Sequence, residues 1–307
     1  MRGRLALLGL AFAALVSPIH AITVFACEPE WAALVRILAP EASIVVATGP
    51  GQDPHQIEAR PSLIAALRRA DLAVCTGAGL EAGWLPVLQA RAGNPRVQDG
   101  RPGMIYMATL TTLVDARLAA RTPFEGDVHP EGNPHFHLDP ERLGALAQGL
   151  AAAISRWEPG LSDSVSRRAR DFAERWQQRV ASWRRRLPDT PVRIVVQHGS
   201  FTYFFRWAGV EVVADLEPKP GVPPTASHLN RVLGEVRSRP PHAVWIASYQ
   251  DARPAQWLRG QLPEIEVVVE PASPSTDADE RALVAYFDRL VERVVALSLR
   301  RATPSIR

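Results

Sequence analysis

The sequence contains few lysines, few cysteines and no long internal hydrophobic run. Lys219 is the single lysine among 35 basic residues, and 32 acidic residues leave a formal net charge of +3. The densest basic cluster, Arg184 to Arg186, ends a predicted helix, where it complements the negative end of the helix dipole. Because the basic residues are not gathered into one footprint, the sequence argues against nucleic-acid binding.

No internal segment is apolar for long enough to cross a membrane as a helix. The apolar run near the start, residues 5–16, is also too short, and it follows Arg2 and Arg4. Pro18 then breaks the run before small residues that suit cleavage, so residues 1–21 have the pattern of a secretory signal peptide. We therefore expect a soluble exported protein, located in the periplasm.

The two cysteines, Cys27 and Cys75, agree with export. In an oxidising compartment a cysteine pair is more often a disulfide than two free thiols. Cys27 could instead carry a lipid anchor. Bulky Phe25 fits a lipobox poorly, however, and Cys27 lies well past the break at Pro18. We expect no lipid anchor.

Short apolar segments alternate with amphipathic segments over most of the chain after residue 21. The segments that are typical of strands are residues 22–27, 43–49, 71–77, 192–199, 210–216, 243–248 and 266–271. Helical patterns lie between them, which predicts mostly parallel sheets flanked by helices. Residues 162–187 form one uninterrupted amphipathic pattern between the two series. The predicted fold class is therefore α/β. It has a first lobe at residues 22–158, a long rigid linker helix at residues 159–189 and a second lobe at residues 190–307.

Polar side chains gather where the predicted strands end. His55 follows the second strand and His198 ends the strand that opens the second lobe, whereas His135 lies in the last connection of the first lobe. Asp277 lies in the loop after the last strand. Ligands of parallel α/β sheets bind beyond the carboxyl ends of the strands, so a cleft between the lobes would face all four residues. Three imidazoles and one carboxylate suit tetrahedral Zn²⁺.

Three motifs then carry a resemblance to a known family. They are the segments "GQDPHQIEARPSLIAALRRADLAVCTGAGLEAGWLP", "NPHFHLDPERL" and "VVQHGSFTYFFRWAGVEV". In this order they resemble the signature of the cluster A-I metal-binding proteins of ABC importers, and the resemblance is strongest to the periplasmic zinc-binding AztC-like and ZnuA-like branch. The family implies two α/β lobes bridged by one long helix, with the metal in the cleft.

The resemblance implies that His55, His135 and His198 are the three histidine ligands. An imidazole at the third position favours zinc, since the manganese-type relatives tend to have a carboxylate there. The family also supplies an acidic ligand from the loop before the last helix. Asp277 is the predicted residue, with Asp279 and Glu280 as alternatives that could instead cap the helix and form its first turn.

The resemblance also implies roles for two further histidines and for the cysteines. The long His-rich loop of the better-known zinc members is absent, and His129 in the short counterpart could relay metal or be a solvated loop residue. His137 takes a position that is usually bulky in the family, so we expect it to support the ligands or to pack. A sheet order of 2-1-3 would make the strands of Cys27 and Cys75 neighbours, which predicts a disulfide between them. Two buried thiols are the alternative.

The sequence therefore predicts a periplasmic, monomeric Zn²⁺-binding protein that delivers its ion to an ABC permease of the inner membrane. A periplasmic zinc chaperone is left open as a second partner. One alternative keeps the fold and imports Mn²⁺ or Fe²⁺. Another is a zinc hydrolase with Asp277 as the base. The chain has no H-E-x-x-H motif, and four ligands would leave no position for a reactive water, so we do not expect an enzyme.

Overall fold

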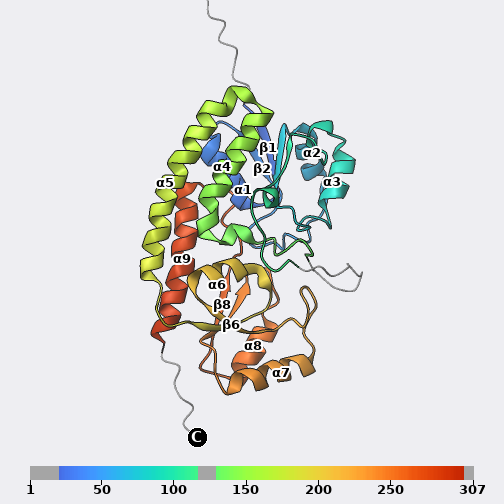
Figure 1. Ribbon diagram of the computed structural model, residues 1–307. Helices are drawn as coiled ribbons and strands as arrows, with labels where there is room; N and C mark the ends of the chain where they lie inside the picture. Colours follow the sequence, from blue (N-terminus) through green and yellow to red (C-terminus); the bar gives the residue numbers. More distant parts are fainter. Residues whose placement is uncertain (1–20, 117–128, 301–307) are drawn as a thin grey trace, which may run out of the picture.

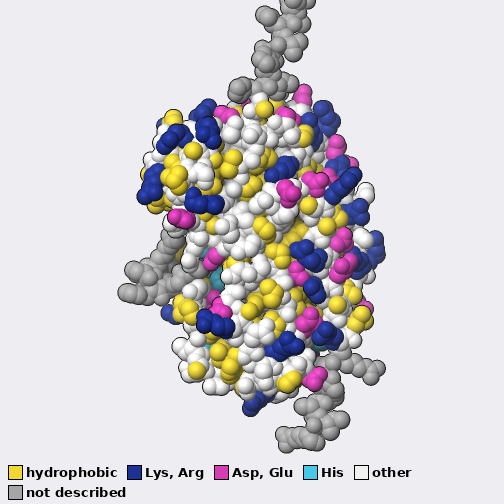
Figure 2. Space-filling view, turned by 180° about the vertical axis from the view of Figure 1, so that it is seen from behind, with side chains coloured by type: hydrophobic (Ala, Val, Ile, Leu, Met, Phe, Trp, Pro, Cys, Tyr) yellow, Lys and Arg dark blue, Asp and Glu magenta, His cyan; other side chains and the backbone are white. Residues whose placement is uncertain are grey.

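The computed structural model describes residues 21–116 and 129–300, which form two α/β lobes joined by long helices (Figure 1). The predicted signal peptide, apart from Ala21, lies outside the described residues. Among the described residues, no helix is long and apolar enough to cross a membrane. Basic and acidic side chains are interspersed over most of the face seen in Figure 2.

The first lobe is built on a parallel sheet of strand order β2-β1-β3-β4. Its strands are β1 Thr23–Ala26, β2 Ser43–Val46, β3 Leu72–Cys75 and β4 Met104–Tyr106, and its helices are α1 Pro29–Leu38, α2 Pro61–Arg69 and α3 Leu85–Ala92. The central strand β3 is buried along its whole length, as its continuous apolar run predicts. The edge strand β4 was not predicted, because three residues are too few to give a period-2 pattern.

The second lobe repeats this plan with strand order β6-β5-β7-β8, again parallel. Its strands are β5 Arg193–Val196, β6 Glu211–Asp215, β7 Ala243–Ala247 and β8 Glu266–Glu270, and its helices are α6 Thr202–Ala208, α7 Ala226–Arg237 and α8 Arg253–Gln261. Helices α2 and α3 cover one face of the first sheet, and α7 and α8 cover one face of the second. The predicted α/β fold class is confirmed.

Three further helices, α4 Pro140–Trp157, α5 Ser162–Arg186 and α9 Glu280–Leu299, pack together along one side of the molecule (Figure 1). Asp139 caps α4 by accepting a hydrogen bond from the amide of Glu141 at 3.0 Å. The predicted long helix is confirmed as α5. Its apolar stripe is buried, and the rings of Trp176 and Trp183 pack on Phe287 of α9 at centroid distances of 5.6 and 5.5 Å.

Two helices, rather than the one expected, therefore connect the lobes. Helix α9 follows the last strand of the second lobe and returns along α5 to contact α1 of the first lobe. One hydrophobic cluster includes residues of both sheets, among them Val24 of β1 and Ile194 of β5. Because breaking this shared core would expose apolar surface, the connection between the lobes is stiff.

The predicted disulfide between Cys27 and Cys75 is present, with a Cα–Cα distance of 4.8 Å. The two residues are at the carboxyl ends of β1 and β3, which are neighbours in the observed order. Helix α3 begins only at Leu85, ten residues after the end of β3. The chain turns through residues 77–79, all with positive φ, before Pro86 enters the first helical turn.

Candidate metal centre

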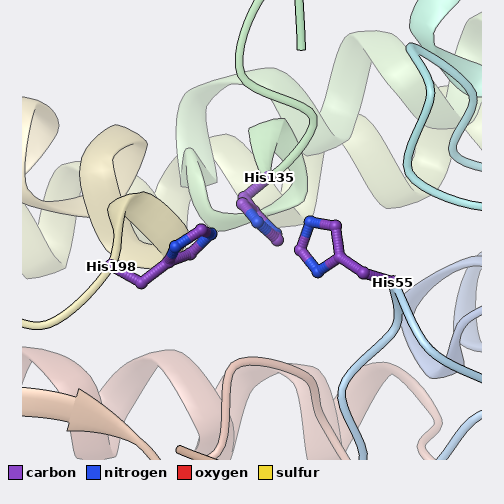
Figure 3. Close-up of side chains that lie close together, drawn as sticks. All are labelled: His55, His135 and His198. Atoms are coloured by element: carbon purple, nitrogen blue, oxygen red, sulfur yellow. The ribbon is translucent and has the colours of Figure 1, made fainter. Parts of the chain in front are cut away.

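Three predicted ligands, His55, His135 and His198, converge between the lobes (Figure 3). One ring nitrogen from each lies within 4.8 Å of the others. His55 comes from the loop between β2 and α2, His135 precedes the short turn before α4, and His198 lies two residues after the end of β5. In Figure 2 a histidine side chain is visible in a hollow between the two lobes.

Carboxylates hold two of these rings from behind. His55 Nδ1 lies 2.7 Å from Asp53 Oδ1, and His198 Nδ1 lies 2.9 Å from Glu217 Oε2. A carboxylate accepts the Nδ1 proton, so each ring is held as the tautomer whose Nε2 carries the lone pair that a metal needs. The sequence analysis missed both carboxylates. Asp53, two residues before His55, could have been found from its spacing, whereas Glu217 comes from another loop.

The same contacts affect the charge of Asp53. Burial by itself would raise its pKa, but the hydrogen bond and the charge of the His55 ring outweigh burial, and the pKa of Asp53 is lowered. The carboxylate is therefore ionised at neutral pH. An ionised carboxylate behind an imidazole makes that imidazole a better electron donor to a cation.

His135 lies deepest in the cluster, with 1% of its surface exposed. Neither of its ring nitrogens has a hydrogen-bond partner within the described structure. Burial, followed by the neighbouring His55 and His198, lowers its pKa well below the usual value, so the ring stays neutral. A buried polar group without a protein partner is unusual, and a neutral imidazole among other imidazoles fits a metal ligand.

A fourth imidazole, His129, lies beside His55 at the edge of this cluster. Its Nε2 lies 3.1 Å from His55 Nε2, and its Nδ1 lies 3.0 Å from the carbonyl oxygen of Ala78. A carbonyl oxygen only accepts, so His129 donates from Nδ1 and directs the lone pair of Nε2 at His55. The sequence had left His129 between a metal relay and a solvated loop residue. The structure places its ring beside that of His55, a predicted ligand.

The structure does not bring the predicted acidic ligand to this cluster. Asp277 is fully exposed, and a hydrogen bond from Ser275 lowers its pKa. Arg36 of α1 holds the loop of Asp277, because its guanidinium donates hydrogen bonds to the carbonyls of Thr276 and Ala278 at 2.8 and 3.0 Å.

The two alternative acidic residues are also engaged elsewhere. Asp279 caps α9 by accepting from the amide of Ala282 at 2.9 Å, and Glu280 forms two hydrogen bonds to Arg175. Their predicted roles at the start of the helix therefore hold. The sequence could not show which of three adjacent acidic residues faces inward, since that depends on how the loop docks on α1.

His137 lies next to the cluster, and its ring contacts residues of both lobes. Its Nε2 donates to the carbonyl of Ala272 at 2.8 Å, and its Nδ1 lies 3.2 Å from Glu30 Oε1 in α1. The ring also meets Trp31 edge-on at a centroid distance of 6.2 Å. These contacts fix the segment that carries His135, two residues before His137.

Two small cavities adjoin the imidazoles. One of about 250 Å³ is lined by Asp53, His55, His198 and Glu217 together with residues of the second lobe. The other, of about 190 Å³, is lined by His129, His135 and His198 and by Asp215, whose pKa burial raises to about 6. Asp215 is a further site residue that the sequence analysis missed.

Comparisons with known proteins support a metal-binding fold. The family model described as "Zinc-uptake complex component A periplasmic" matches residues 24–298. A curated relative from Thermotoga maritima, named "Putative metal-binding protein", is 28% identical over 189 residues. That match covers 61% of this chain and only 61% of the relative's own length.

Solved structures share the fold at low sequence identity. A crystal structure of ZnuA has a TM-score of 0.73 at 18% identity, covering 91% of this chain and 99% of the other. The periplasmic zinc-binding protein TroA from Treponema pallidum has a TM-score of 0.71 at 18% identity, covering 91% and 99%. FpvC from Pseudomonas aeruginosa, in complex with Mn²⁺, has a TM-score of 0.70 at 18% identity, covering 91% and 98%.

Proposed function

Because this chain belongs to the family of the periplasmic component A of zinc-uptake complexes, we propose that it captures Zn²⁺ between its lobes and delivers the ion to an ABC permease. The family is one of metal-binding substrate-binding proteins rather than enzymes. The ion is therefore the cargo and is not used for catalysis. The observation that carries the proposal is the convergence of His55, His135 and His198, with ring nitrogens within 4.8 Å of one another.

The donor set favours zinc over harder cations. Imidazole nitrogens suit Zn²⁺, whereas Mn²⁺ and Mg²⁺ prefer carboxylate, carbonyl and water oxygens. The two carboxylates beside the cluster, Asp53 and Glu217, hydrogen-bond to imidazole Nδ1 atoms rather than facing the centre. Import of Mn²⁺ or Fe²⁺ is the alternative within the same fold, and one similar structure, FpvC, contains Mn²⁺.

For the fourth ligand the geometry favours His129 over Asp277. His129 Nε2 is 3.1 Å from His55 Nε2, whereas the exposed Asp277 would have to turn inward with a loop that Arg36 holds. The three imidazoles would take three positions of a tetrahedral site, and His129 is the further imidazole beside His55. The exposed position of Asp277 disfavours the zinc hydrolase, in which Asp277 would act as a base.

Delivery requires a partner and a way to release the ion. We assign the partner as an ABC permease because members of this family supply such permeases, and we expect the binding protein to act as a monomer. The shared core between the lobes opposes a wide hinge motion. We therefore place release in movement of the loop that carries His55, rather than in separation of the lobes.

The test is a zinc titration in competition with a chromophoric chelator. His135→Ala should weaken Zn²⁺ binding by more than the ~10–100-fold typical of removing an outer partner of a metal ligand. His242→Ala, which removes a histidine outside the cluster, is the matched control and should bind as the wild type does. Unchanged zinc affinity in His135→Ala would show that the site lies elsewhere.

The metal is tested separately, by native mass spectrometry after equal concentrations of Zn²⁺ and Mn²⁺ compete for the apo protein. We expect the zinc-loaded mass to dominate. A dominant manganese mass would assign the protein to the alternative cargo while leaving the site in place.

A further inference from the structure

A second group of potential metal ligands lies in the first lobe, apart from the three imidazoles. The sulfur atoms of Cys27 and Cys75 and one carboxylate oxygen of Glu81 lie within 4.8 Å of one another. All three residues are buried, with exposed fractions of 0%, 0% and 3%. Cysteine sulfur and carboxylate oxygen are both ligands of Zn²⁺ in proteins, but the sulfur must be a thiolate. In the observed state the two sulfurs form a disulfide, so the group cannot bind zinc.

Backbone hydrogen bonds hold the two cysteines side by side, independently of the bond between their sulfurs. The amide of Cys27 donates to the carbonyl of Val74 on β3 at 2.9 Å, and the carbonyl of Cys27 accepts from the amide of Thr48 at 3.1 Å. Ala26 of β1 pairs with Val74 in the same parallel ladder. Because none of these contacts involves sulfur, breaking the disulfide would leave the side chains of Cys27 and Cys75 as neighbours.

The carboxylate of Glu81 is held close to the cysteine pair by the chain that follows Cys75. Its Oε1 accepts from the amide of Thr76 at 2.6 Å, and its Oε2 accepts from the amide of Gly77 at 3.0 Å. Each carboxylate oxygen has a further lone pair, so these bonds position the group and leave it able to bind a cation. Burial raises the pKa of Glu81 to about 7, because no cation among the described residues forms an ion pair with it.

A second buried acid, Glu28, directly follows Cys27. Its Oε2 accepts from the hydroxyl of Thr76 at 2.9 Å, whereas its Oε1 is buried without a hydrogen-bond partner among the described residues. Burial, followed by the charge of Glu81, raises the pKa of Glu28 well above its usual value. Buried acids without a cation are costly. A cation held by the sulfurs and Glu81 would offset negative charge that the fold leaves uncompensated.

Glu81 also forms part of the wall of a cavity that would give an ion access. The cavity has a volume of about 460 Å³, and its wall includes Gly77, Tyr106 and the carboxylates of Asp99 and Glu131. A hydrogen bond from Tyr106 lowers the pKa of Asp99, which is therefore ionised at neutral pH. Carboxylates that line a cavity raise the local concentration of cations.

We propose that reduction of the disulfide converts Cys27, Cys75 and Glu81 into a second zinc site, separate from the imidazoles. The reductant is a dithiol, which gives two electrons to the Cys27–Cys75 bond and becomes a disulfide itself. The bond between the two protein sulfurs breaks, and the two protons are released when Zn²⁺ binds the thiolates. Glu81 supplies the third ligand, and water from the cavity takes the fourth position.

The experiment counts the metal ions bound by the oxidised protein and by protein that dithiothreitol has reduced, after removal of the reductant under inert gas. Native mass spectrometry should show one Zn²⁺ on the oxidised protein and two on the reduced protein. Co²⁺ on the reduced protein should add a near-ultraviolet charge-transfer band from thiolate to metal, which imidazole ligands do not give. One bound zinc and no such band after reduction would overturn the proposal.

His135→Ala separates the second site from the imidazoles. The oxidised variant should bind no zinc, whereas the reduced variant should bind one ion and resist urea better when zinc is present. Adding Glu81→Gln should keep the sulfur band but weaken this binding by more than the ~10–100-fold typical of an outer partner. Glu131→Gln, at an exposed carboxyl group of the same cavity, is the matched control and should leave the affinity unchanged. Unchanged affinity with Glu81→Gln would overturn the assignment of Glu81.

The double variant Cys27→Ser/Cys75→Ser tests the sulfur ligands. It should bind one zinc with or without prior reduction, and a second zinc in this variant would overturn the proposal. Failure of the proposed function gives a different pattern, because oxidised His135→Ala would then bind zinc as the wild type does. The sulfur band of the reduced protein would not change in that case, so the two failures are distinguishable.

Discussion

The stability of the apo protein should fall as pH rises through neutrality, because of the buried pair Glu28 and Glu81. Burial raises the pKa of Glu81 from 4.5 to about 7, and burial together with the charge of Glu81 raises the pKa of Glu28 well above its usual value. Between pH 4.5 and about 7 the folded state therefore binds more protons than the unfolded state does. Under that condition the free energy of unfolding decreases with pH.

The size of the effect follows from the shift of Glu81. A rise in its pKa from 4.5 to about 7 corresponds to roughly 3 kcal/mol, at about 1.4 kcal/mol per pKa unit. This stabilisation is fully present below the unfolded pKa and is lost once the pH exceeds the folded pKa. The double variant Glu28→Gln/Glu81→Gln keeps the size and most acceptors of both side chains but removes the titration.

The assay is urea unfolding of the metal-free protein at pH 5 and pH 8.5. The wild type should lose at least about 2–3 kcal/mol more than the double variant over this interval, because Glu81 alone accounts for that amount and the raised pKa of Glu28 adds to it. Glu264→Gln, at an exposed carboxyl group, is the matched control and should follow the wild type. Equal pH dependence in the wild type and the double variant would refute the raised pKa values of the two buried carboxyl groups.

Two more predictions concern the disulfide and the support of His198. Replacing Cys27 and Cys75 by serine frees a loop of 48 residues. The chain-entropy relation gives a loss of about 4 kcal/mol in the free energy of unfolding, which urea unfolding would measure. A loss under about 1 kcal/mol would contradict this prediction. Glu217→Gln should weaken zinc affinity about 10–100-fold, since the amide no longer holds the His198 tautomer. Glu211→Gln, which changes a residue of an exposed ion pair, is the control for Glu217→Gln. Equal zinc affinities in these two variants would show that Glu217 does not support the site.

The order of the elements could be predicted from the sequence because it depends on local patterns. Apolar runs of strand length alternate with amphipathic segments, and the stripe that includes Trp176 and Trp183 has helical spacing over 25 residues. Asp139 and Pro140 start α4 by local chemistry alone. The connection made by α9 could not be predicted, since its apolar face packs on α5 of a distant segment.

The three histidines could also be identified from the sequence. His55 and His198 follow strands, and parallel strands bring their carboxyl ends to one edge of a sheet. The motif around His135 identified the third histidine. What the sequence left open was the fourth ligand, because adjacent loop residues such as Asp277 and Asp279 differ only in the direction of their side chains.

Only the tertiary structure decided the surroundings of these histidines. The packing of separate loops sets which carboxylate stands behind which imidazole, as with Glu217 and His198, which are 19 residues apart. The Ala78 carbonyl meets His129, which is 51 residues further along the chain. Strand order, helix ends and motif positions are encoded over a few residues each. The direction of a ring or a carboxylate depends on contacts between segments that are far apart in the chain.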